Sequence, residues 1–414
     1  MNKLNFILTR IALLLLLLNI ANITIYAGVD QKKVDSLKNV IANTQDSKEK
    51  VNGKIALAKE YLATDKEKVF EYLNQAIDIS KEANRPDLLF SSYNNIGLAY
   101  HNVSEYDKAI KYFQKALSYK NKLRSDEQRK MIGSTYNNLG RAYSSKDDKD
   151  SSLYFYKKSI KSKEQTGQYL SMAKTLSNIG VLYFRLDNYQ KAYEYFIESL
   201  KMKKKHGADP RSLSKTLTNI GNVFLRTEKH NKAIEYYNRS ADIKKQYGDR
   251  PGISTVYSNI ANILMFNNKL DSSLIYYNKS LKIKKQIGDK RGIAGIYNNI
   301  ATVYRKKSDL SKSEEYNLKA LNIRQEIGNK RGIAASKTNL GSIYLEQGKY
   351  NESFKNLEEA RKIAEENSYD RVLEEVYYNL TAYYEARNNP QKALGFHKKY
   401  HSIREKLLDL DANA

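Results

Sequence analysis

The chain of 414 residues contains no cysteine and no tryptophan, and only four prolines. Without cysteine there is no disulfide framework, no thiol nucleophile, no cysteine-based metal site and no cysteine to carry a lipid. Proline interrupts helices, so its scarcity leaves long stretches free to be helical. These absences remove several classes of site and favour an all-helical fold.

Signals for catalysis are also missing. The five histidines are His101, His206, His230, His397 and His401. Only the last two are spaced as neighbours on a helix, and no carboxylate between them completes a zinc-protease motif. There is no glycine-rich phosphate loop and no nucleophile elbow. We therefore expect no enzyme activity, no catalytic residue, no metal and no cofactor.

Positive charge is abundant but uneven, with a formal net charge of +25. Residues 341–414 carry 11 basic against 13 acidic residues, or −2, which leaves 60 against 33, or +27, for residues 1–340. A field of this sign favours acidic partners or anionic surfaces. The alternative is a lysine-rich solvated surface. Nucleic acid is not expected, because the tyrosines fall at packing positions and the N-terminus indicates export.

Residues 1–27 have the pattern of a signal peptide. Lys3 and Arg10 precede an apolar run over residues 11–18, and Ala27 offers a small residue for cleavage. We expect an exported protein, periplasmic or extracellular. The alternative is an uncleaved segment, Phe6 to Tyr26, that anchors the chain in the inner membrane. No second apolar run of that length follows, so contact with a membrane is expected only through this segment.

The dominant feature is an internal repeat. Small residues recur at intervals of 43, 40, 41, 40, 40, 40 and 40, at Gly97, Gly140, Gly180, Gly221, Ala261, Ala301, Gly341 and Thr381. We call these positions the anchors. A fixed period in this range predicts a solenoid, in which each unit packs only on its neighbours.

Each unit is predicted to hold two helices. In the first helix, apolar residues at −4, −1 and +3 from the anchor share one face, and the small anchor allows the second helix to approach. Glycine ends the second helix at 248, 288 and 328, and a second glycine at 252, 292 and 332 is expected before the next helix. The predicted segments are a leader helix at 28–49, a degenerate first unit at 50–86, a regular array at 87–389, and a final helix and tail at 390–414.

The motif Asn-(Ile/Leu)-Gly-x-x-Tyr, followed by Tyr-x-Lys-Ala-x-x-Tyr-(Phe/Tyr), resembles the tetratricopeptide repeat. The forty-residue period resembles its longer variety, found in kinesin light chains and the Pins-type spindle adaptor. The resemblance implies an all-α, right-handed solenoid of about nine helix-turn-helix units, whose first helices line a concave groove. Serine replaces the alanine of the second helix at 152, 273, 313 and 353, a departure expected to change only packing detail.

A second stripe on the first helices, at −6, −2, +1 and +5 from the anchor, is predicted to line the groove. We call it the polar stripe. Its −2 position is asparagine in every regular unit, at Asn95, Asn138, Asn178, Asn219, Asn259, Asn299, Asn339 and Asn379. A carboxamide can bond both N–H and C=O groups of an extended peptide, and the family resemblance supports this role. The alternative is that these amides bond neighbouring helices.

Basic residues also fall on or beside the polar stripe. They are Lys174 and Lys215 at −6, Arg185, Arg226 and Lys306 at +5, and the adjacent Arg305. They predict an acidic segment or a free carboxyl terminus as the ligand, with solvated charge as the alternative. A separate basic column near the ends of the second helices is expected to extend its charges into water; it comprises Lys120, Lys163, Lys203, Lys244, Lys284 and Arg324.

The sequence therefore predicts a non-enzymatic scaffold that binds an extended, acidic protein segment in its groove. As an exported array that opens with the short leader Val34-Asp35-Ser36-Leu37, the chain also resembles the sensory regions of Bacteroidetes-type histidine kinases and helix-turn-helix regulators. No kinase or DNA-binding module stands in this sequence. The alternative is therefore a ligand-sensing, ectodomain-like protein, expected to be a truncated sensor of a histidine kinase or transcription regulator, that acts with a membrane-bound signalling partner.

Overall fold

The computed structural model describes residues 29–412, so the predicted signal peptide lies outside the described residues. Within that range the chain forms nineteen α-helices, one short 3-10 helix and no strand. The prediction of an all-α array of paired helices is confirmed. The chain divides into two compact units, unit 1 up to Asn188 and unit 2 from Tyr189.

Helices alternate between first and second members of a pair. The leader is α2 (Gln31–Asn43), and the short 3-10 helix η1 (Lys120–Lys122) follows α6. The first helices are α3 (Ser47–Tyr61), α5 (Pro86–Asn102), α7 (Asp126–Ser145), α9 (Tyr169–Arg185), α11 (Pro210–Arg226), α13 (Arg250–Phe266), α15 (Lys290–Lys306), α17 (Lys330–Glu346) and α19 (Asp370–Ala386). The second helices are α4 (Lys66–Glu82), α6 (Tyr106–Leu117), α8 (Lys149–Gln165), α10 (Tyr189–Lys205), α12 (His230–Gln246), α14 (Leu270–Gln286), α16 (Leu310–Glu326), α18 (Tyr350–Glu366) and α20 (Pro390–Ala412).

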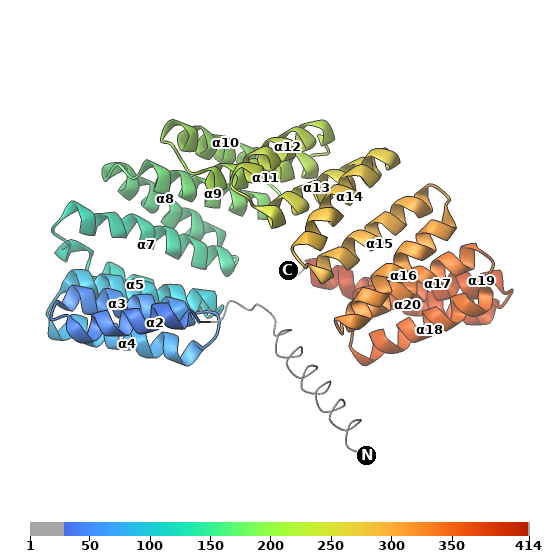
Figure 1. Cartoon of the computed structure of the whole chain (residues 1–414), viewed down its shortest axis with the longest axis horizontal. Helices are drawn as coiled ribbons and strands as arrows, with labels where there is room; N and C mark the ends of the chain where they lie inside the picture. The colour runs from blue at the N-terminus through green and yellow to red at the C-terminus, as the bar shows by residue number, and fades with distance from the viewer. Residues whose placement is uncertain (1–28, 413–414) are drawn as a thin grey trace, which may run out of the picture. The chain divides into compact units, whose positions relative to one another are not determined.

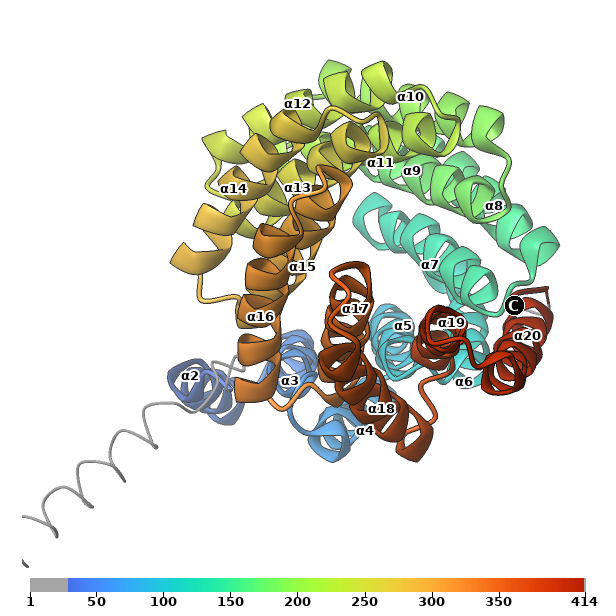
Figure 2. The same cartoon turned by 90° about the vertical axis from the view of Figure 1, so that its right-hand side faces the viewer.

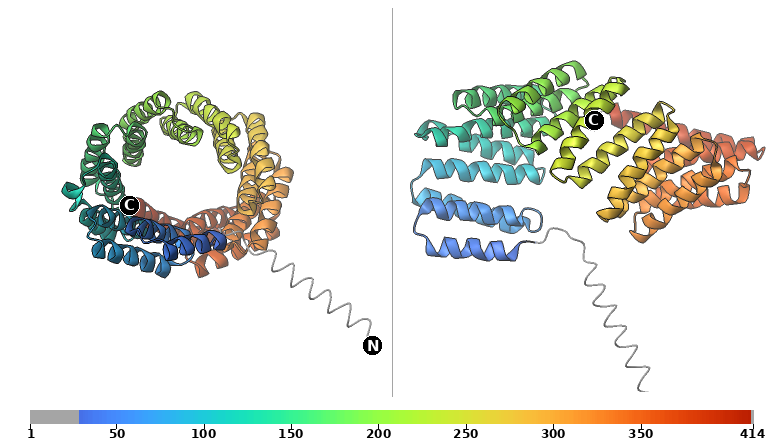
Figure 3. Two further views of the ribbon diagram at one scale, coloured as in Figure 1. Left: turned by 60° about the vertical axis from the view of Figure 1, so that its left-hand side comes forward. Right: turned by 45° about the horizontal axis from the view of Figure 1, so that its top comes forward.

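Within each unit the helices pack in sequence order. In unit 1, α2 packs on α3, and the pairs α3/α4, α5/α6 and α7/α8 follow one another (Figures 1 and 2). In unit 2, α10 packs on α11, and five pairs follow up to α19/α20; the right-hand view of Figure 3 shows its yellow and orange helices in a row. Each helix therefore packs mainly on its near neighbours in the chain, as a repeat array requires.

The anchors hold each pair together through close approach. A Cβ added to Gly140 would lie 2.5 Å from the ring of the buried Tyr156, and one added to Gly221 would lie 2.7 Å from the ring of Tyr237. The serine that replaces alanine in the second helix has a defined partner, because the Ser152 hydroxyl donates to the Gly140 carbonyl over 2.8 Å. Ser273, Ser313 and Ser353 donate to their own anchors over 2.8, 2.9 and 2.8 Å.

The basic column near the second-helix ends is mostly not solvated, so the expectation of charges extended into water is wrong for five of its six members. Lys163 is 1% exposed, and its ammonium donates to Thr175 Oγ1 over 2.7 Å. Lys203 donates to Thr216 Oγ1 over 2.6 Å, and the Arg324 guanidinium donates to Ser336 Oγ over 2.6 Å. Lys244 and Lys284 pair with aspartates, and only Lys120 is exposed. Because each second helix ends against the next first helix, these five basic residues find partners on that helix or at its N-cap.

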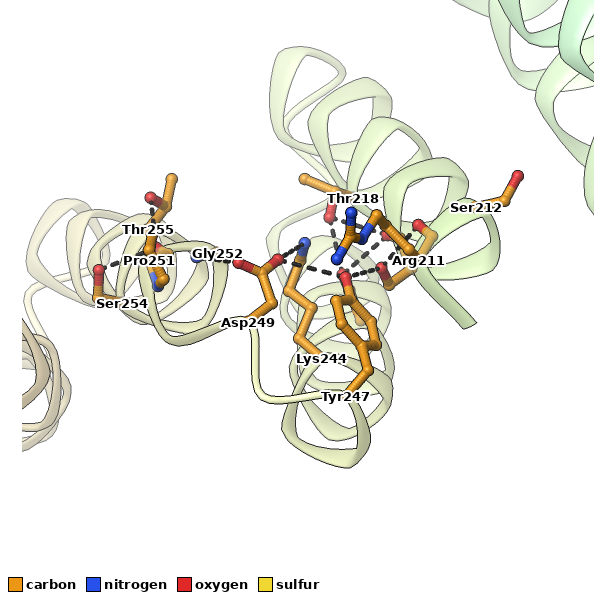
Figure 4. A network of polar contacts seen from close by, with 12 residues as sticks. Arg211, Ser212, Thr218, Lys244, Tyr247, Asp249, Pro251, Gly252, Ser254 and Thr255 are labelled. Carbon is orange, nitrogen blue, oxygen red and sulfur yellow. Dashed lines mark hydrogen bonds and ion pairs between the residues drawn. The ribbon is translucent and has the colours of Figure 1, made fainter. Parts of the chain in front are cut away.

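The linker at Asp249 shows how successive pairs are joined (Figure 4). Its carboxylate accepts from Lys244 Nζ over 2.9 Å and from the Gly252 N–H over 2.9 Å. Gly252 lies inside α13, not before it, which corrects the predicted helix start. Glycine leaves room for the side chains there, because a Cβ would lie 2.1 Å from the Asp249 carboxylate and 2.8 Å from Lys244 Nζ and would make them shift. Asp289 and Gly292 repeat the arrangement forty residues later.

Candidate functional site

The asparagine column of the polar stripe is half-buried in every regular unit. Three of these asparagines form a hydrogen bond with the first helix of the preceding helix pair. Asn138 Nδ2 donates to Asn94 Oδ1 over 3.2 Å, and Asn178 Nδ2 donates to Asn137 Oδ1 over 2.9 Å. In unit 2, Asn339 Nδ2 donates to Asn298 Oδ1 over 2.8 Å. These amides link adjacent first helices, as the alternative of bonds to neighbouring helices predicts. In each of them the Oδ1 atom and the second N–H of the amide remain available for other partners.

The other asparagines are placed differently. Asn95 and Asn379 donate to carbonyls of their own helices over 2.8 and 2.7 Å, and Asn259 lies beside the Tyr237 hydroxyl. The side chains of Asn219 and Asn299 form no hydrogen bond with any residue in the described range 29–412. A half-buried amide ordinarily has a partner, so these two positions have donors and acceptors available for a ligand or water.

The cations of the polar stripe divide into paired and unpaired groups. Arg185 donates to Asp147 over 2.5 Å, and Arg305 forms an ion pair with Glu346. Four others are exposed and form no ion pair with the described part of the chain: Lys174, Lys215, Arg226 and Lys306. Exposed and unpaired ammonium and guanidinium groups can bind carboxylates without first breaking an internal contact.

Lys174 also acts on the buried Lys163 of the preceding helix. Burial lowers the pKa of Lys163 to about 7, and the charge of Lys174 contributes to the lowering. The two ammonium groups therefore disfavour each other, and an anion held at Lys174 would relieve that repulsion.

A cavity of about 490 Å³ in unit 2 brings together parts of the stripe from three first helices. Arg305, Asn339 and Asn379 line it, with Ser342, Glu374, Glu375, Tyr378 and Tyr400. Tyr378 is 61% exposed, and its ring lies 5.8 Å from that of Tyr400. The pKa of Glu375 is raised, first because the surrounding protein partly removes its carboxylate from water and second because of the negative charge of the neighbouring Glu374. The stripe is thus cationic at α11 and α15 but acidic at α19.

A second cavity, of about 260 Å³, lies in unit 1 between α3, α4 and α5. Asn95 is the only member of the predicted site that lines it. The remaining predicted residues line neither of these two cavities: Asn138, Asn178, Asn219, Asn259, Asn299, Lys174, Lys215, Arg185, Arg226 and Lys306.

Sequence reasoning missed several residues that line the two cavities. Arg141 stands at +1 from Gly140, and Glu375 stands at −6 from Thr381, so the stripe offsets themselves reach both. Tyr400 lies on the final helix, α20, and the stripe offsets cannot select it because they are counted along the first helices only. Ile55, forty residues before Asn95, was hidden because the first unit lacks the asparagine motif.

Comparison with known families decides the identity of the array. A sequence model described as tetratricopeptide repeat matches residues 88–165, 171–246, 252–326 and 332–406, more than half of the chain. The chain belongs to the tetratricopeptide repeat family. Such repeats are in general non-catalytic interaction modules, so membership supports a role in protein interaction. No curated protein sequence matches the chain.

Solved structures with a similar fold cover most of this tetratricopeptide array. The apo form of RapI has a TM-score of 0.65 at 12% identity, covering 87% of this chain and 98% of that chain. Aspartyl phosphate phosphatase F from Bacillus subtilis has 0.55 at 14%, covering 86% and 94%. The apo form of the quorum sensor NprR from B. thuringiensis has 0.54 at 16%, covering 80% and 98%. At these identities the likeness concerns the fold alone.

The described helices carry neither a membrane span nor a metal cluster. Between residues 29 and 412, no helix has the length and hydropathy that a membrane span needs. Within the same range, no three His, Cys, Asp or Glu side chains are grouped as a metal site would require.

Proposed function

We propose that the polar stripe of this tetratricopeptide protein binds an extended protein segment with acidic residues, and that the chain acts as a scaffold without enzyme activity. The observation that carries the proposal is the set of half-buried amides at Asn219 and Asn299, which have no partner in the described range, beside the exposed cations Lys215, Arg226 and Lys306. Amides suit the peptide backbone, and the cations suit its carboxylates.

The charges of unit 2 also favour particular positions along the stripe for the acidic residues of the bound segment. Lys215, Arg226 and Lys306 lie on α11 and α15, whereas Glu374 and Glu375 lie on α19. An acidic residue of the segment is therefore favoured against α11 to α15 and disfavoured at α19, where like charges repel.

The test distinguishes asparagines that bind a peptide from asparagines that only connect neighbouring helices. A peptide-display library is selected on the full chain, the enriched peptides are synthesised, and dissociation constants are measured by calorimetry. Asn299→Ala removes an amide that holds no neighbour, and Asn339→Ala removes one that donates to Asn298. We expect Asn299→Ala to weaken binding about two- to tenfold, the range of one hydrogen bond, with an unchanged melting temperature. Asn339→Ala should lower stability.

Two results would overturn the proposal. One is a selection that yields no peptide or only peptides without acidic residues. The other is full affinity in the Asn219→Ala/Asn299→Ala double variant. The cationic part has its own measurement, because affinity that does not fall between about 50 and 500 mM salt would exclude charge recognition at Lys215, Arg226 and Lys306.

We further propose that the protein is exported through residues 1–27 and acts outside the cytoplasm. Lys3, Arg10, the apolar run at 11–18 and Ala27 support this proposal. Cell fractionation and N-terminal sequencing test it: a mature chain that begins at Gly28 indicates cleavage, and retention in the membrane after a carbonate wash indicates an anchor. Recovery of the intact chain in the cytoplasm would refute export.

A second candidate function is the sensing of a diffusible ligand together with a membrane-bound signalling partner. The observation that favours it is the cavity in unit 1, whose walls are mostly apolar and whose volume of about 260 Å³ suits a small molecule. Peptide recognition by the stripe and ligand binding in this cavity use different residues, so each can be tested without the other.

A further inference from the structure

The cavity of unit 1 owes its apolar character to the degenerate first pair. Ile55 and Ala58 on α3, and Leu62 directly after its end, stand forty residues before Asn95, Leu98 and Asn102 on α5, so they occupy the −2, +1 and +5 positions of the polar stripe. At the −2 position the regular repeats have an asparagine amide, whereas the first pair has the hydrocarbon side chain of Ile55. The stripe therefore changes from polar to apolar at this end of unit 1.

The cavity reaches behind the first helices to the second helix α4. Its floor includes Val69 and Leu73, which are 3% and 2% exposed, and Ala99 closes the side from α5. Such buried apolar walls bind poorly hydrated groups, because apolar surface gains free energy when it leaves water. A volume of about 260 Å³ lies below the range of roughly 300–1,000 Å³ for drug-sized ligands. The occupant is accordingly small.

The cavity wall carries positive charge without a counter-ion. Arg141 on α7 is half-buried and Lys59 on α3 is exposed, and neither forms a hydrogen bond or ion pair through its side chain with any residue between 29 and 412. Among residues 29–412, no aspartate or glutamate lines the cavity. The nearby acid of α3, Glu60, is already paired with Lys33 over 2.6 Å. A guanidinium in this position binds a carboxylate through two parallel hydrogen bonds.

We propose that this cavity is a binding site for a small organic acid, with an apolar body between α3, α4 and α5 and a carboxylate on Arg141. Lys59 adds a second positive charge at the rim, and the exposed amide of Asn102 adds hydrogen-bond donors. Apolar walls beside unpaired cations favour an acid as the ligand, because an amine would be repelled and a neutral molecule would gain no charge-assisted hydrogen bond from the guanidinium.

The inference deepens the second candidate function, on which it rests for its biological meaning, and it names the class of ligand that would be sensed. Binding in the cavity is measured without any signalling partner. If the acid binds while no signalling effect follows, the sensing proposal fails and the site stands.

The experiment uses two pairs of probes of nearly equal shape, phenylacetate with phenylacetamide and 4-methylpentanoate with 4-methylpentanamide. Binding to the full chain is measured by calorimetry and by ligand-observed NMR. We expect the acids to bind with dissociation constants roughly between micromolar and millimolar, and the amides to bind at least about tenfold more weakly, since each amide lacks a charge-assisted bond to the guanidinium.

Variants locate the site. Arg141→Gln should weaken the acids to the level of the amides, whereas Arg129→Gln, on the same helix but exposed and paired with Asp126, should leave both unchanged. Ala58→Leu places a larger side chain in the cavity and should exclude all four probes, with circular dichroism confirming that the helices persist. Equal binding of acid and amide, or full acid affinity in Arg141→Gln, would overturn the proposal. Binding only of peptides with an apolar residue beside an acidic one would likewise refute a free acid as the occupant.

Discussion

Replacement of the buried Lys163 by methionine should make the stability of the array less dependent on pH. The ammonium of Lys163 is enclosed between α8 and α9, where it donates to Ser171 O over 3.1 Å and to Thr175 Oγ1 over 2.7 Å. Neither partner is an anion, and no carboxylate within residues 29–412 forms an ion pair with this ammonium. Burial lowers its pKa from 10.5 to about 7.

The sign follows from proton binding. Between pH 7 and 10.5 the unfolded chain holds a proton on this lysine that the folded chain has largely released, so stability rises with pH over this window. At about 1.36 kcal/mol per pKa unit, a group with these two values gains about 2 kcal/mol between pH 7 and pH 9. Methionine has a similar length and does not titrate, so the variant lacks this gain.

The assay is urea unfolding followed by circular dichroism at pH 7 and pH 9. We expect the stability difference between Lys163→Met and wild type to shift by about 2 kcal/mol in favour of wild type at the higher pH. Lys161→Met, at an exposed position on the same helix, controls for the loss of one lysine. Lys174→Gln should reduce the shift, because the Lys174 charge contributes to it. A difference that is the same at both pH values would refute the buried, uncompensated ammonium.

Three further predictions concern packing and the linkers. Asn317→Leu should stabilise the chain by about 1–3 kcal/mol in thermal unfolding, because the buried Asn317 Oδ1 has no partner in the described range; a destabilised variant would contradict this. Gly140→Ala should cost about 1–3 kcal/mol, because its Cβ would meet the Tyr156 ring. Tyr156→Ala removes that ring, so the double variant should lose less stability than the sum of the two single variants; a loss equal to that sum would exclude the contact as the cause. Burial tends to raise the pKa of Asp249, but Lys244 and the Gly252 N–H hold it below its ordinary value. Stability from this carboxylate is present above about pH 4 and lost as the pH falls through its lowered pKa, so Asp249→Asn should be less stable than wild type at pH 7 and converge with it near pH 2 in chemical unfolding.

The polar stripe has different chemistry at different first helices. It is apolar at α3, where Ile55 and Ala58 line the unit 1 cavity, cationic at α11 and α15, and acidic at α19. Because the packing face repeats while the stripe varies, the repeat supports the fold and the variation supports recognition. The two proposals follow this division: a peptide segment on the amides and cations, and a small acid at the apolar end.

The sequence by itself determined the architecture, because packing in a repeat array is local and periodic. The spacing of Gly140 and Gly221 from Tyr156 and Tyr237 recurs in the chain, and such near-neighbour packing can be read from the period alone. The stripe offsets likewise selected Asn95 and Asn339, each of which lines one of the two cavities. What they could not indicate is which side chains already have partners.

Only the tertiary structure decided how the polar groups are distributed. It placed Lys163 in the interior, because the end of α8 meets α9, and it bonded Asn339 to Asn298 while leaving Asn299 without a partner in the described range. It also formed the unit 1 cavity, where the degenerate pair removes the amide and the side chains of three successive pairs converge. Hydrogen bonds and cavities depend on the distance between helices, and the period of a sequence does not specify that distance.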